Sequence, residues 1–161
     1  MSVRPSNFSP SRRSVLRGVA VLPVVAAAGA AVSACGPTTD EERDLAERLV
    51  EHARAAVRQQ EAAAALAPRT TEYTAALTVV AQQRGEHAQA LRDEVNRVHS
   101  SSAGRIDDPS APLATVDALR EALVSSTRAS GGAAVTESGF VAGLLASVSA
   151  SCKTLAEVQL A

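Results

Sequence analysis

The stretch "TEYTAALTVVAQQRGEHAQALRDEVNRVH", residues 71–99, carries a long and uninterrupted helical pattern. Its apolar side chains recur every three or four residues, and no proline breaks the run. We therefore expect a helix over residues 71–99. Its apolar stripe is predicted to consist of Tyr73, Leu77, Val80, Ala88, Leu91, Val95 and Val98.

Three further segments show helical patterns. Residues 40–67 begin with acidic side chains, which favour a helix N-terminus, and run to Pro68. Residues 113–129 predict a shorter helix, and the pair Gly131–Gly132 is expected to separate it from a fourth helix over residues 134–160. The expected core faces comprise Leu45, Leu49, Ala56 and Ala63 in the first helix, Val116, Leu119 and Leu123 in the third, and Val141, Leu144, Val148, Leu155 and Val158 in the fourth.

The connections between these segments are short, and residues 100–112 are expected to form a loop. No segment alternates between polar and apolar residues as a half-buried strand does. Short connections between long helices favour antiparallel neighbours. The sequence therefore predicts an all-α, up-down four-helix bundle over residues 40–161.

The first 34 residues have the pattern of an export signal. Residues 1–17 contain four arginines and no acidic residue, and residues 18–34 are uncharged, apolar and interrupted by Pro23. The run is too short and too rich in alanine and glycine for a typical membrane-spanning helix. The segment "SRRSVLR", residues 11–17, is similar to the twin-arginine export motif, with Arg12 and Arg13 as the arginine pair.

The apolar run ends in "VSAC", residues 32–35, which is similar to a bacterial lipobox. In that motif the cysteine is acylated and becomes the first residue of the mature chain. We therefore expect Cys35 to be lipidated, residues 35–39 to form the anchor and a short linker, and the protein to lie on the extracytoplasmic face of the cell membrane. The chain has one other cysteine, Cys152. If Cys35 were instead a free thiol, a disulfide between the two cysteines would be possible.

The composition of the mature part restricts its partners. Without residues 1–34 the chain keeps all 17 acidic residues but only 12 of its 16 basic ones, a formal charge of −5. An acidic chain with few aromatic residues does not favour nucleic acid, whose phosphates require basic patches. The expected partners are the membrane, through the lipid anchor, and an envelope protein or a second copy of the chain. The nearly uncharged stretch 139–151 is either a contact face between copies of the chain or simply part of the bundle core.

Several polar residues interrupt the predicted apolar faces. At 100° per residue, Arg84 lies at the centre of the stripe of residues 71–99, and His87 lies at its edge. In the first helix Gln60 is central and His52 lies at the edge. The first interpretation is a structural polar layer that fixes helix register. Its expected members are Gln60, Arg84, His87 and Glu94.

Two functional interpretations stand beside the structural one. His52, His87 and Cys152 are expected at one height of the bundle, where they would offer ligands for a metal ion or haem. A di-iron site, however, needs Glu-x-x-His pairs, and Leu49 and Arg84 stand where those glutamates would be. The other interpretation is an anionic ligand bound around Arg84. No catalytic motif is recognised, so an enzyme is the less favoured class, and any cofactor stays unknown.

The features "SRRSVLR", "VSAC" and "LTVVAQQRGEHAQALRDEVNRV", residues 77–98, resemble a group of alanine-rich, twin-arginine-exported lipoproteins of actinobacteria. The resemblance implies a ferritin-like helical domain on a lipid anchor. From the anchor motif, the acidic composition and the lack of a catalytic motif, we expect a membrane-anchored binding or scaffold module of the cell envelope. The alternative is a metal- or haem-handling protein that uses the layer around His52 and His87, and the ferritin-like resemblance would suggest iron for it.

Overall fold

The computed structural model describes residues 39–108 and 110–161, and these residues confirm an all-helical domain with four long helices and no strand. The predicted export signal over residues 1–34 and the candidate lipidation site Cys35 lie outside the described residues.

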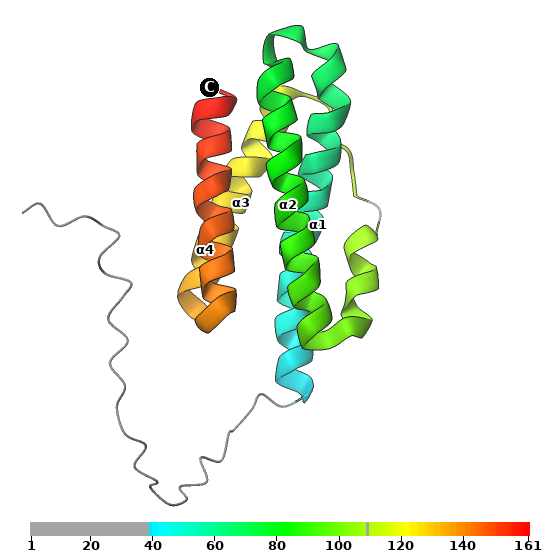
Figure 1. Cartoon of the computed structure of the whole chain (residues 1–161), viewed down its shortest axis with the longest axis vertical. Coiled ribbons are helices and arrows are strands. Elements are labelled where there is room, and N and C mark those ends of the chain that lie inside the picture. Colours follow the sequence, from blue (N-terminus) through cyan, green and yellow to red (C-terminus); the bar gives the residue numbers. More distant parts are fainter. Residues whose placement is uncertain (1–38, 109) are drawn as a thin grey trace, which may run out of the picture. The chain divides into compact units, whose positions relative to one another are not determined.

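The helices form two hairpins (Figure 1). In the first hairpin, α1 (Thr39–Leu66) and α2 (Thr74–His99) are joined by two single 3₁₀ turns, Ala67–Arg69 and Thr71–Tyr73. Pro68 lies in the first of these turns and ends α1, because proline cannot donate the next helical hydrogen bond. In the second hairpin, α3 (Val116–Thr136) leads directly into α4 (Gly139–Thr154), which ends in a π-helical turn, Leu155–Gln159.

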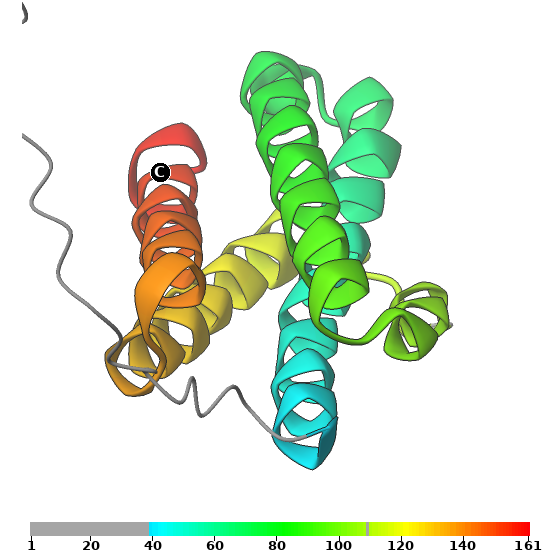
Figure 2. The same ribbon diagram turned by 60° about the horizontal axis from the view of Figure 1, so that its bottom comes forward.

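The order of helix directions differs from the expected alternation. Hydrogen bonds and an ion pair join Gln59 to Ala122, His52 to Ser130 and Arg48 to Glu137. Along these three pairs the α1 numbers fall as the α3 numbers rise, so α3 runs antiparallel to α1 and parallel to α2. The bundle is therefore up-down-down-up, as Figures 1 and 2 also show.

The reason for this order lies in the connection between α2 and α3. Residues 100–112 were expected to be a simple loop, but Ser100–Asp107 forms a 3₁₀ segment, η4, that packs against both α1 and α2. The chain then continues along α1, where Arg58 Nε donates to the carbonyl oxygen of Ala111 at 2.6 Å. This crossover returns the chain to the end of the bundle where α1 finishes, and α3 starts from there.

The glycine pair does not separate the third and fourth helices. α3 continues through Gly131 and Gly132 to Thr136, and the corner is made by extended backbone at Glu137 and Ser138 followed by Gly139 with φ +56°. The predicted boundaries at 129 and 134 were therefore wrong. Glycine weakens a helix by only about 1 kcal/mol, which tertiary packing can override.

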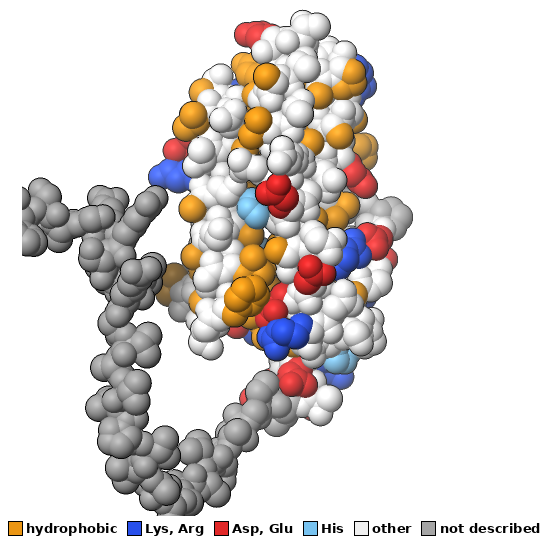
Figure 3. Space-filling view, viewed as in Figure 1, with side chains coloured by type: hydrophobic (Ala, Val, Ile, Leu, Met, Phe, Trp, Pro, Cys, Tyr) orange, Lys and Arg blue, Asp and Glu red, His pale blue; other side chains and the backbone are white. Residues whose placement is uncertain are grey.

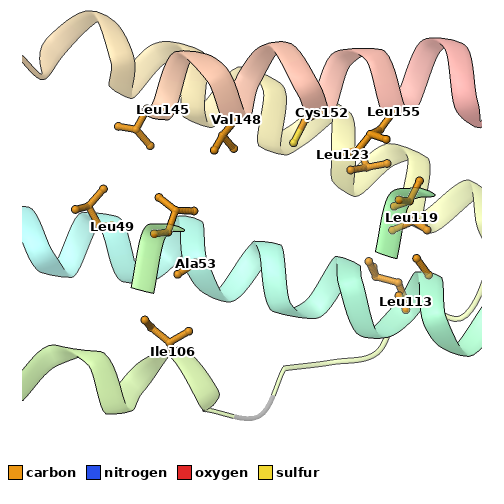
Figure 4. Packing of buried hydrophobic residues seen from close by; sticks show 14 of the residues in the cluster. Leu49, Ala53, Ile106, Leu113, Leu119, Leu123, Leu145, Val148, Cys152 and Leu155 are labelled. Atoms are coloured by element: carbon orange, nitrogen blue, oxygen red, sulfur yellow. The ribbon is translucent and has the colours of Figure 1, made fainter. Parts of the chain in front are cut away.

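The hydrophobic core lies between the two hairpins and beneath the crossover. Figure 4 shows Leu49 and Ala53 on α1 beneath Leu145 and Val148 of α4, with Ile106 of η4 pointing towards α1 from the opposite side. The α1–α2 interface is rich in buried alanines, which let these helices approach closely. α1 therefore packs against neighbouring elements on two sides, so that a wide part of its surface is buried.

α4 and its π-helical continuation form the most apolar helix of the described residues. By length and composition Gly139–Gln159 is the one described helix that would be able to cross a membrane, and about a third of its most apolar window is buried in the domain. In the domain this helix packs against α3 and contributes Val141, Leu145 and Val148 to the core.

Two glycines of α3 allow a direct test of how this helix packs against α4. A Cβ atom at Gly132 would meet nothing within 4 Å, so Gly132→Ala should raise the free energy of unfolding by about 0.5–1 kcal/mol, as for an exposed helix interior. Gly131→Ala is the matched control, because its Cβ would lie 3.0 Å from Ser149 Oγ. Chemical denaturation should therefore give a smaller gain, or a loss, for Gly131→Ala. Equal gains would contradict the placement of α4 against α3.

Candidate functional site

Arg84 lies at the centre of the buried face of α2, as the sequence predicted, and has 0% exposure. The other buried positions of this face are apolar, with the exception of Glu94 near the C-terminal end of the helix. The guanidinium interacts electrostatically with Cys152 of α4 and with His52 of α1. The charge of Arg84 is therefore placed where the two hairpins meet.

The charge of Arg84 has no carboxylate partner among the described residues. Its Nη1 donates to Nδ1 of His87 at 2.9 Å, and its buried Nε has no hydrogen-bond partner there. Burial lowers the pKa of Arg84, and Cys152 opposes that effect. A buried charge ordinarily requires a counter-charge, because its desolvation costs several kcal/mol.

The two histidines near Arg84 are held neutral. Burial and the Arg84 charge together lower the pKa of His87 from 6.5 to about 4, and the same two causes lower the pKa of His52. Because arginine can only donate, His87 Nδ1 acts as the acceptor in the neutral ring. His52 Nδ1 lies 3.3 Å from Ser130 Oγ of α3.

Cys152 is a free, fully buried thiol. Burial raises the pKa of Cys152, and the nearby Arg84 charge partly opposes this rise. The neutral thiol therefore dominates near neutral pH and does not supply the missing anion.

The glutamines of α1 differ from the prediction in detail. Gln60 was expected at the centre of the buried face, but it is half-buried, and Gln59 is the buried glutamine with 2% exposure. Gln59 donates to the carbonyl oxygen of Ala122 and to Ser126 Oγ on α3. Gln60 instead packs beside Gly85 of α2. The reason is that α1 faces α2 and α3 at once, so two adjacent positions both face a neighbouring helix.

Glu94, another expected member of the layer, does not neutralise Arg84. It is 4% exposed and pairs with Arg97, whose Nε donates to Oε2 at 2.8 Å. Ten residues of α-helix separate it from Arg84, which corresponds to about 15 Å along α2. Glu94 therefore belongs to the end of the helix and not to the layer around Arg84.

Side-chain hydrogen bonds join the two hairpins around this layer. In addition to the bonds of Gln59 and His52 to α3, Ser151 Oγ of α4 donates to Gln83 Oε1 of α2 at 2.7 Å. Within the second hairpin, at the end where α3 begins, Arg120 Nε donates to the carbonyl oxygen of Leu160 at 2.6 Å. The serines that take part on α3 and α4 were not singled out from the sequence, because serine is common on solvated helix faces and its spacing gives no distinct signal.

The three proposed metal ligands share one neighbouring charge, that of Arg84. His52, His87 and Cys152 each feel the charge of Arg84. Within residues 39–108 and 110–161, however, no group of three or more His, Cys, Asp or Glu side chains is arranged to hold a metal ion. A guanidinium in their midst also repels a cation.

Comparisons with protein-family models, with curated proteins and with solved structures find no match to this chain. The function is therefore inferred from the side chains themselves and from the arrangement of the helices.

The neutral histidines predict a loss of stability in mild acid. The pKa of His87 is lower in the folded chain than its ordinary value of 6.5, so the unfolded chain binds more protons between pH 6.5 and about pH 4. Stability should therefore fall as pH decreases through this range, by about 1–2 kcal/mol after allowance for partial solvent screening. Thermal unfolding at a series of pH values measures this loss.

His87→Gln is the matched control, because glutamine keeps an acceptor for Arg84 but does not titrate. This variant should lose less stability than the wild type between pH 6.5 and pH 4. His52, whose pKa is lowered in the same way, contributes a further part of the dependence. Identical pH profiles for the two proteins would show that protonation of His87 is not opposed by Arg84.

Proposed function

We propose that this chain is a lipoprotein of the bacterial cell envelope whose helical domain acts by binding. Export by the twin-arginine route is supported by Arg12 and Arg13 within "SRRSVLR", and an acyl anchor by Cys35 within "VSAC". Together these two motifs favour a position at the extracytoplasmic face of the cell membrane. There the domain would bind a ligand or serve as a scaffold for an envelope protein or for a second copy of the chain.

The observation that carries the binding role is the uncompensated guanidinium of Arg84. A side chain with 0% exposure, one histidine as hydrogen-bond partner and no ion pair among the described residues is costly to keep in a bundle core. An apolar residue of the same size would avoid that cost. We infer that the charge serves to bind a small anion, such as a carboxylate, phosphate or sulfate group, which would neutralise Arg84 and accept the hydrogen of Nε.

The construction of the interface supports a route for such a ligand. The guanidinium itself is closed to solvent, so the ligand must enter as the α3–α4 hairpin moves away from α1 and α2. The contacts that would have to separate are the apolar core between the hairpins and side-chain hydrogen bonds, among them those of His52 to Ser130 and of Ser151 to Gln83. The crossover allows this motion, because its last residues, 110–115, lie outside the helices.

The ferritin-like resemblance stays part of the proposal. One long crossover between the second and third helices is also the connectivity of ferritin-like bundles. Iron chemistry does not follow from it, because Leu49 and Arg84 occupy the positions that a di-iron site would give to glutamate. Handling of a metal or haem by His52, His87 and Cys152 is the alternative interpretation of the sequence, and no grouping of ligands among the described residues supports it.

Anion binding is tested by thermal unfolding of the mature protein in phosphate, sulfate or acetate against chloride at equal ionic strength. At least one of these anions should stabilise the wild type, by about 2.7 kcal/mol at a concentration one hundred times its Kd. Arg84→Met should abolish this anion-specific gain. In chloride the same variant should be as stable as the wild type or more stable, by up to about 4 kcal/mol, because an isolated buried charge has been removed.

Arg92→Met serves as the control, since Arg92 is a surface residue that pairs with Asp107. It should keep the anion response of the wild type. Equal responses of the wild type and Arg84→Met would contradict binding at Arg84. A strong destabilisation of Arg84→Met in chloride would show instead that the guanidinium has a structural role.

Export and anchoring are tested separately. Protein purified from membranes should begin at Cys35 and carry the mass of attached acyl chains, and Cys35→Ala should remove it from the membrane fraction. Replacement of Arg12 and Arg13 by lysine should leave the precursor in the cytoplasm. An unmodified Cys35 in membrane-derived protein would contradict the proposed lipid anchor but would leave the proposed anion binding at Arg84 unaffected.

A further inference from the structure

The corner between α3 and α4 exposes two large apolar side chains that are near each other in the chain. Val135 is 85% exposed and Phe140 is 69% exposed, and among the described residues only Val158 shares this property. Single exposed apolar residues are common on protein surfaces. Here, however, two of the three lie within six residues of chain at one sharp turn, and one of them is aromatic.

Among the described residues, the chain segment that forms this corner carries no unpaired charge. Between Arg128 and Lys153 the only charged residue is Glu137, and Arg48 of α1 neutralises it with Nη2 2.9 Å from Oε1. The other exposed residues of the corner are small and uncharged, namely Gly132, Thr136, Ser138 and Gly139. In Figure 3 the charged side chains gather over α2 and the crossover, whereas the part over α4 carries few of them.

The corner lies at the end of the bundle where α1 begins. The ion pair of Glu137 with Arg48 fixes the corner beside the first third of α1, and Thr39 lies nine residues before Arg48. In Figure 1 the start of α1 and the corner lie towards the same, lower end of the bundle. Cys35 precedes Thr39 by four residues, which can span at most about 14 Å.

We propose that the α3–α4 corner is a second membrane contact, in which Phe140 and Val135 enter the interfacial region of the bilayer beside the lipid anchor. This inference rests on the proposed acylation of Cys35, since that anchor holds this end of the domain near the lipid. The contact is apolar rather than electrostatic, because the first turn of α1 contains Asp40, Glu41 and Glu42 and does not favour an anionic lipid surface. The preferred partner is therefore a zwitterionic bilayer surface.

The chain contains no tryptophan, so a single introduced indole can report on each position. The mature lipoprotein with Phe140→Trp is reconstituted into phosphatidylcholine vesicles with and without brominated acyl chains. Val135→Trp is a second probe of the same corner. Val158→Trp is the matched control, because Val158 is 66% exposed but follows the start of α4 by 19 residues, about 28 Å along the helix.

In vesicles, the indoles of Phe140→Trp and Val135→Trp should emit at shorter wavelength than in solution. The reference in solution is the same variant with Cys35→Ala added, which removes the lipid anchor and needs no detergent. Brominated lipid should quench both by about twofold or more, as for side chains at the bilayer interface. The indole of Val158→Trp should be neither shifted nor quenched.

Absence of quenching at both corner probes, in protein whose acylation is verified by mass, would overturn the proposal and leave the anchor intact. A blue shift without quenching, which grows with protein density, would also overturn it and would assign the corner to a second copy of the chain. Protein that lacks the acyl mass would contradict the anchor on which this inference rests, and with it the second contact.

Discussion

The guanidinium of Arg84 lies buried where the two helical hairpins meet. Among the described residues it has no counter-ion, and the groups around it are neutral. His87 must stay neutral to accept its hydrogen bond, and His52 is held neutral by burial and by the same charge. Cys152 faces the charge as a thiol, since burial outweighs the attraction of Arg84. The remaining contacts between the hairpins include side-chain hydrogen bonds from serine and glutamine. The interface therefore combines an apolar core with polar side chains that surround a buried charge.

The crossover determines which helices surround this charge. Because residues 100–115 return along α1, the third helix starts beside the end of the first and runs antiparallel to it. α1 consequently lies between α2, α3 and the crossover, and Ile106 covers the side of α1 opposite to α4. A strictly alternating bundle with a short second connection would start α3 at the other end of the bundle. The hydrogen bonds of Gln59 and His52 to α3 would then not form.

The sequence predicted the parts of this arrangement that depend on one helix at a time. The regular stripe of residues 71–99 places Arg84 at its centre, because apolar residues flank it at helical spacing on both sides. The burial of Gln59 rather than of Gln60 depends on two neighbours of α1, which no single periodic pattern contains. Ile106 lies among serine and charged residues, so the packing of the crossover had no visible signal. The pair Gly131–Gly132 indicates a break by propensity alone, and the packing of α3 against its neighbours overrides it.

The measurement that tests the central claim most directly is the NMR signal of the Nε–H group of Arg84, assigned by its loss in Arg84→Met. A buried guanidinium without an anionic partner predicts a proton that exchanges slowly with water and lacks the downfield shift of a hydrogen bond to an anion. Addition of the anion that raises the unfolding temperature should then move the signal downfield. A downfield-shifted signal already present in chloride would show that Arg84 is paired within the chain and would contradict the account.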